Sequence, residues 1–139
     1  MPTAIVVYTG ELSTDAEHAS SGTVIRTDAP KDNQGLGRTY SPTDLLATAL
    51  GSCMLTIMGI RARTAGIDIS GTKASITKIM ADQPRRVSEL VVEIEVIDRN
   101  LSKQDKSALE HAALHCPVAK SLSEHLVQTV RFSYTNPLY

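Results

Sequence analysis

Several features that would direct the interpretation of this sequence are absent or scarce. The chain has 139 residues, no tryptophan and one phenylalanine, so its core must be built mainly from aliphatic side chains. Only two cysteines are present. The formal net charge is −1 at pH 7. Without a basic excess, the chain lacks the electrostatic signature of a nucleic-acid-binding protein.

Targeting and membrane segments are not evident either. The chain begins Met-Pro-Thr-Ala, without the basic segment and apolar stretch of a secretory signal. No window reaches the roughly 20 apolar residues of a membrane-spanning helix. We therefore expect a soluble, cytoplasmic protein with no membrane partner. In that reducing compartment, a cysteine pair is expected to be catalytic or regulatory, because permanent disulfides are rare there.

The motifs of several enzyme classes are missing. There is no G-x-S-x-G elbow, no P-loop and no dinucleotide fingerprint, so hydrolase and nucleotide-dependent functions have no motif support. His111 and His115 are four residues apart, but the sequence has neither His-Glu-x-x-His nor Cys-x-x-Cys. We expect no metal and no other cofactor.

What is present predicts an α+β protein that forms one domain over residues 1–139, because strands and helices do not alternate regularly. A polar turn is expected at 10–19 and a loop at 28–40. The strands expected around 72–80 and 87–97 should form an antiparallel hairpin, since apolar and polar residues alternate in the second. The other expected strands are 3–9, 20–27 and 127–134, and the expected helices are 42–64, 102–115 and a short one from 117 to 125.

The long helix has the best-defined start. Ser41 suits the N-cap, Pro42 the first helical position, and Asp44 completes a pattern similar to a capping box. Apolar residues then recur at spacings of three and four, which predicts one buried face. Its expected members are Leu46, Ala49, Leu50, Cys53, Ile57 and Ile60.

The two cysteines each allow two interpretations. Cys53 is either a small core residue or a reactive thiol, and the apolar residues near it (Met54, Ile57, Met58) form either core or an apolar entrance. Cys116 precedes Pro117, where it either fills a kink or caps a helix whose N-terminus would lower its thiol pKa. As a pair, they satisfy the need of a thiol peroxidase for a cysteine that attacks the O–O bond and another that condenses with the sulfenic acid.

Two segments carry a family resemblance. Residues 41–53 are SPTDLLATALGSC, and residues 115–122 are HCPVAKSL. Together they resemble the paired signature of the OsmC/Ohr family of thiol-dependent hydroperoxide reductases. The resemblance implies an intertwined homodimer with antiparallel sheets around long central helices. It also implies that Cys53 reduces an organic hydroperoxide to an alcohol, that Cys116 closes a disulfide with Cys53, and that a lipoyl-type dithiol restores both thiols.

The chain departs from this family pattern at the residues that would activate the thiolate. Peroxidase members have Glu after the helix-starting Pro, and this chain has Thr43, followed by Asp44. Arg26 and Arg38 are candidates for the arginine that approaches Cys53, or they are ordinary surface charges. The alternative function is therefore a protein of this fold that binds a small molecule or lipid, or senses redox state, with little peroxidase turnover.

Overall fold

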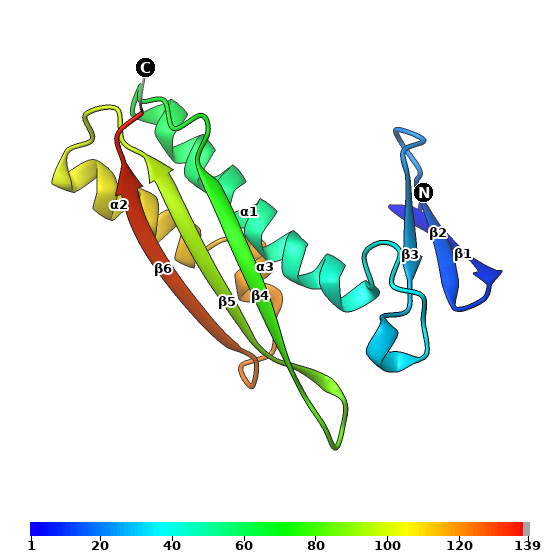
Figure 1. Cartoon of the computed structure of the whole chain (residues 1–139). Coiled ribbons are helices and arrows are strands. Elements are labelled where there is room, and N and C mark those ends of the chain that lie inside the picture. The colour runs from blue at the N-terminus through cyan, green and yellow to red at the C-terminus, as the bar shows by residue number, and fades with distance from the viewer. Residues whose placement is uncertain (138–139) are drawn as a thin grey trace. The chain divides into compact units, whose positions relative to one another are not determined.

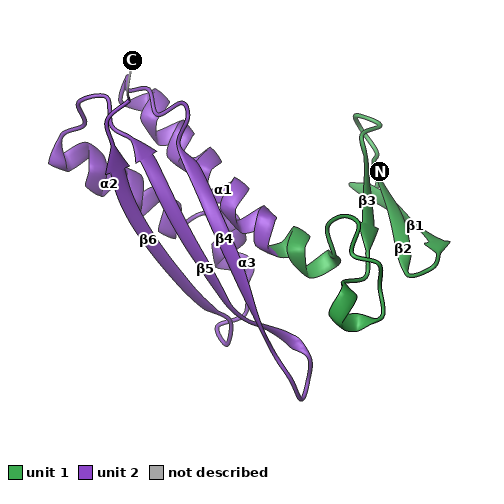
Figure 2. Cartoon of the chain, in the orientation of Figure 1, with its two compact units in different colours: residues 1–46 green, residues 47–139 purple. Residues whose placement is uncertain are grey.

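Three antiparallel strands begin the chain in the computed structural model, which describes residues 1–137. They are β1 (Ala4–Gly10), β2 (Ser13–His18) and β3 (Val24–Asp28), in the order β1-β2-β3. With the short 3-10 helix η1 (Lys31–Asn33) and the loop up to residue 41, they belong to a first unit, residues 1–46 (Figures 1 and 2). The second unit starts at Ala47.

Strand β2 corrects the prediction of a polar turn over residues 10–19. The turn is confined to Gly10, Glu11 and Leu12, which all have positive φ. The strand that follows, STDAEH, has one apolar residue, so hydrophobic alternation could not reveal it. Its partners on both sides satisfy its backbone instead, which makes the polar segment a central strand.

The second unit is built on a mixed sheet of three strands, β4 (Lys73–Ala81), β5 (Arg86–Ile97) and β6 (Val127–Thr135). The predicted antiparallel hairpin of β4 and β5 is confirmed. However, β6 is parallel to β5, so the expectation of purely antiparallel sheets is wrong. The chain between β5 and β6 contains two helices, and a crossover of that kind returns the next strand in the parallel direction.

Helices cover one face of this sheet (Figure 1). They are α1 (Pro42–Thr64), α2 (Lys103–Leu114) and α3 (Pro117–Ser121). Ser102 and Asp105 form a capping box at the start of α2. Helix α3 is shorter than predicted, because the backbone is already extended at Leu122. The α+β class is confirmed, whereas the single domain over residues 1–139 stays a prediction.

The core lies between the sheet and these helices. Alternate residues of β5 are at most 1% exposed, which confirms the predicted alternation: Leu90, Val92, Ile94 and Val96. They pack with buried residues of α1 and α2. Each buried side chain of this size contributes about 1.5 to 3 kcal/mol, so this layer accounts for much of the stability of the second unit.

The buried face of α1 differs from the predicted one. Ala49 and Ile60 are exposed, and Cys53 is only partly buried. The buried residues are Ala47, Leu50, Gly51, Met54, Met58 and Ala62. The helix is apolar around much of its circumference, so spacing alone did not determine which side meets the sheet. At Gly51 a Cβ atom would lie 2.3 Å from Ile76 Cδ1, which shows how closely this side approaches the sheet.

By length and composition alone, α1 is long and apolar enough to span a membrane. The expectation that no segment meets that criterion is wrong. A core helix passes the same test, and α1 packs its buried side against the sheet of the second unit.

Candidate functional site

The two cysteines come together in the second unit. Cys53 lies in the middle of α1, and Cys116 is the N-cap residue of α3. The Val118 N–H donates to Cys53 Sγ over 3.5 Å, and the Ala119 N–H donates to Cys116 Sγ over 3.5 Å. The first turn of α3 therefore contacts both sulfur atoms.

The environments of the two thiols differ. Cys53 is partly exposed, whereas Cys116 is 0% exposed and belongs to the hydrophobic core. Both are free thiols. Of the two interpretations of Cys116, the one in which it caps a helix is confirmed. A dissolved reagent can reach Cys53 more readily than Cys116.

Burial raises the pKa of the Cys116 thiol, and the neighbouring Cys53 thiol raises it further. The N–H groups of Ala119 and Val118 act in the opposite direction. The expectation that the helix N-terminus would lower this pKa is therefore wrong, because the pKa is raised when all contributions are combined. The cost of removing a charged sulfur from water outweighs its stabilisation by a few backbone dipoles at the end of a short helix. The sequence His-Cys-Pro does not reveal this burial.

A residue that sequence reasoning missed holds α3 in place. Gln128 on β6 donates from Nε2 to the Ala119 carbonyl over 3.0 Å. Within α3, the Ser121 hydroxyl donates to the Pro117 carbonyl over 2.8 Å. The available signal was the pattern of β6, where Gln128 occupies an inward position of an otherwise apolar strand face.

The start of α1 is capped as predicted. The Asp44 N–H donates to Ser41 Oγ over 3.1 Å, and the Ser41 N–H donates to an Asp44 carboxylate oxygen over 2.9 Å. The hydroxyl groups of Thr43 and Ser41 are 3.2 Å apart. The capping role of Asp44 is thus confirmed, and an orienting role of Thr43 or Asp44 toward the thiolate stays a prediction.

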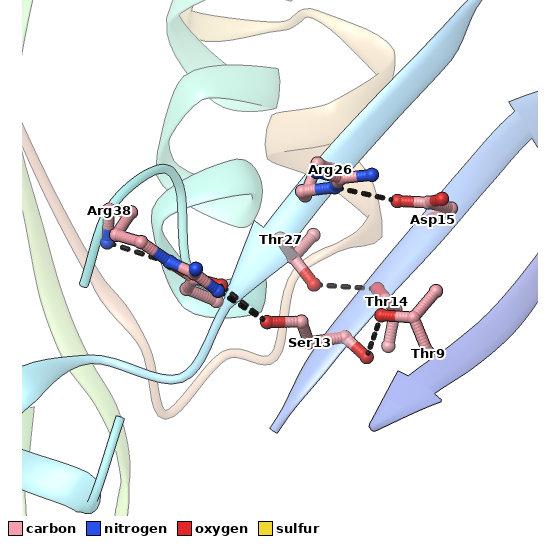
Figure 3. Close-up of polar contacts among 8 residues, drawn as sticks. Thr9, Ser13, Thr14, Asp15, Arg26, Thr27 and Arg38 are labelled. Atoms are coloured by element: carbon pink, nitrogen blue, oxygen red, sulfur yellow. Dashed lines mark hydrogen bonds and ion pairs between the residues drawn. The ribbon is translucent and has the colours of Figure 1, made fainter. Parts of the chain in front are cut away.

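Both candidate arginines pair with carboxylates in the first unit (Figure 3). Arg26 Nε lies 3.0 Å from Asp15 Oδ1. Arg38 binds Asp28 through Nε at 2.8 Å and Nη2 at 3.1 Å. Asp28 is 2% exposed and also accepts a short hydrogen bond from the Ser13 hydroxyl. That either arginine serves Cys53 stays a prediction.

The Arg38 guanidinium, followed by the Ser13 hydroxyl, holds the pKa of the Asp28 carboxyl far below its usual range. The carboxylate is therefore ionised throughout the neutral range. A bidentate pair of this kind fixes the plane of a guanidinium, so the loop at 28–40 presents Arg38 in one orientation.

His111 on α2 and His115, the C-cap residue of this helix, are not arranged for a metal. The His111 and His115 rings are stacked, with centroids 4.1 Å apart and planes 25° from parallel, so their nitrogen lone pairs do not converge on one point. Within residues 1–137, no three or more His, Cys, Asp or Glu side chains are grouped to hold a metal ion.

Comparisons with known proteins agree with the motif analysis. A family model described as OsmC-like protein matches residues 34–131. A solved structure from Psychrobacter arcticus 273-4, described as an osmotic stress induced and detoxification response protein, is 50% identical with a TM-score of 0.91 over 96% of each chain. Among curated proteins, none matches this chain.

Two more distant structures share the fold. The organic hydroperoxide resistance protein OhrB of Bacillus subtilis is 16% identical with a TM-score of 0.67, over 95% of this chain and 98% of its own. The organic hydroperoxide resistance protein OsmC of Legionella pneumophila is 18% identical with a TM-score of 0.68, over 97% of this chain and 98% of its own.

Proposed function

Because this chain belongs to the OsmC-like protein family, we propose that it is a thiol-dependent peroxidase that reduces organic hydroperoxides to alcohols. The observation that carries this proposal is the thiol pair: a partly exposed Cys53 and a buried Cys116, both contacted by the first turn of α3. The resemblance to the OsmC/Ohr family that the two motifs predicted is confirmed by the family match. The hydroperoxide resistance of the two distant relatives favours an organic peroxide as substrate.

In the first step, the Cys53 thiolate attacks the terminal oxygen of the hydroperoxide. The O–O bond breaks, the sulfur is oxidised to a sulfenic acid, and the departing alkoxide takes a proton to become the alcohol. The Val118 N–H, 3.5 Å from Cys53 Sγ, stabilises the anionic sulfur that begins this step, because a hydrogen bond to a charged form favours that form.

In the second step, Cys116 resolves the sulfenic acid. Its thiolate attacks the sulfur of Cys53, an S–S bond forms, and the hydroxyl group leaves as water after taking a proton. A dithiol of the lipoyl type then reduces the disulfide by exchange and is itself oxidised. The sum is one hydroperoxide and one dithiol converted to one alcohol, one water and one oxidised dithiol.

The difference in burial supports this division of roles between the two cysteines. The attacking sulfur must meet a peroxide from solution, and Cys53 is the more exposed of the two. The resolving thiol needs only to reach its neighbour. Being buried with a raised pKa, Cys116 stays protonated near neutral pH and is protected from direct oxidation, since the thiolate is the reactive form.

We place the protein in the cytoplasm as a homodimer, with no cofactor and no nucleic-acid or membrane partner. The lipoyl-type reductant is proposed because a dithiol can remove the disulfide in one intramolecular exchange after the first attack.

Turnover with two peroxides tests the function directly. Purified protein is supplied with dihydrolipoamide and either cumene hydroperoxide or hydrogen peroxide, and thiols are counted before and after. We expect catalytic consumption that favours the organic peroxide, with two thiols per chain lost when the reductant is omitted. No consumption, with both thiols intact, would instead favour a ligand-binding protein of this fold, in which Thr43 replaces the activating Glu.

The resolution step should depend steeply on pH. Since the pKa of the Cys116 thiol is raised, its thiolate fraction at pH 6 to 8 is small and increases about tenfold per pH unit. After one equivalent of peroxide has formed the sulfenic acid, disulfide closure should therefore accelerate by about tenfold per unit over this range. Stopped-flow mixing followed by thiol counting measures it. A rate that does not change with pH would contradict thiolate formation at Cys116 as the controlling step.

A further inference from the structure

Strand β6 has a polar residue where its own pattern predicts an apolar one. Gln128 is paired with Leu90 of β5, which is 0% exposed. The next residues on the same face, Val130, Phe132 and Tyr134, pack against the core. An apolar side chain at 128 would satisfy the alternation. A break in a local rule at a conspicuous position is most often found at a functional or strained site.

The amide of Gln128 is used on α3. Its Nε2 donates to the carbonyl of Ala119 over 3.0 Å, and Ala119 is the residue whose N–H contacts Cys116 Sγ. Helix α3 has five residues, far too few to be stable in isolation. The last carbonyl groups of any helix have no partner within the helix. Gln128 satisfies one of them from the sheet and so fixes the helix to β6.

We infer that Gln128 is a positioning residue for the thiol pair: by holding the Ala119 carbonyl, it keeps the N–H groups of Val118 and Ala119 directed at the two sulfur atoms. Both donor–sulfur distances are 3.5 Å, an ordinary length for an N–H group that donates to sulfur. Because Val118 and Ala119 are consecutive residues in the first turn of α3, a change in the position of this helix would alter both contacts together. The redox consequence of this inference rests on the proposed function, whereas its effect on thiol reactivity does not.

Alkylation of Cys53 tests the inference without any peroxide. Cys116→Ser leaves one thiol and keeps a side chain that can cap α3. In that background, Gln128→Leu removes the amide but preserves size and inward packing. Because a thiolate gains more from an N–H donor than a thiol does, we expect iodoacetamide to react with Cys53 roughly threefold to tenfold more slowly at pH 7.

Gln128→Glu is the second variant, in case the leucine protein does not fold. A carboxylate cannot donate to the Ala119 carbonyl and is repelled by it, so the change in alkylation should have the same sign. Glutamate has nearly the same size and shape as glutamine. Circular dichroism and the melting temperature establish that each protein is folded.

The matched control is Tyr134→Phe. Tyr134 lies on the same face of β6, and its hydroxyl donates to Glu110 Oε2 over 2.5 Å, so this variant also removes one side-chain hydrogen bond between β6 and a helix. That helix is α2 and not α3. We therefore expect Cys53 to be alkylated at the same rate as in the Cys116→Ser protein without a second substitution. If Gln128→Leu leaves alkylation unchanged, or if Tyr134→Phe slows it equally, Gln128 has only a structural role. A protein that reduces no hydroperoxide but shows the Gln128 effect would refute the proposed function and keep the inference.

Discussion

Cys53→Ser is expected to abolish hydroperoxide reduction. A serine hydroxyl has nearly the same size and position but is not ionised near neutral pH, so turnover of cumene hydroperoxide should fall by at least about a thousandfold, as when other enzymes lose their nucleophile. Cys53 is only partly buried on α1, and the substitution creates no large cavity. The loss should therefore occur without a comparable loss of stability.

The assay measures the loss of peroxide with dihydrolipoamide as the reductant. The melting temperature of each protein is measured separately. Ser52→Ala is the matched control, because Ser52 is the exposed neighbour of Cys53 on the same helix. It should retain the rate of the original protein. If Cys53→Ser still consumed cumene hydroperoxide at that rate, Cys53 would not be the attacking residue, and the function would have to be assigned elsewhere in the molecule.

The sequence was a good guide where local chemistry decides structure. Ser41 and Asp44 marked the start of α1, and the alternation of β5 marked its inward face. Residues 41–53 and 115–122 also identified the family. These signals are local: a cap, a period of two residues, or a fixed string around each cysteine.

The errors came from features that depend on tertiary contacts. Strand β2 is polar and was missed because its neighbours, not its composition, make it a strand. The face of α1 that meets the sheet was misassigned, since apolar residues occur on several sides of the helix. The pKa of the Cys116 thiol was given the wrong direction because burial outweighs the helix N-terminus. Gln128 was overlooked because its partner is a backbone carbonyl of α3.

Cys116→Ser is expected to convert a cycling enzyme into one that reacts once. Cys53 remains able to attack the peroxide, because its position and its contact with the Val118 N–H do not require the second thiol. The sulfenic acid then has no neighbouring thiol to condense with. One equivalent of cumene hydroperoxide per chain should be consumed rapidly, and the steady-state rate that follows should be a small fraction of the original.

Trapping distinguishes this outcome from simple inactivation. A sulfenic acid reagent such as dimedone should label Cys53 in the Cys116→Ser protein at close to one per chain, and mass spectrometry locates the adduct. The unsubstituted protein, given the same equivalent of peroxide, should lose both thiols and show little label, because Cys116 lies beside Cys53 and closes the disulfide first. Continued turnover of Cys116→Ser at the original rate would mean that the external dithiol reduces the sulfenic acid directly. The buried thiol would then be a core residue that caps α3, and the catalytic cycle would need only Cys53.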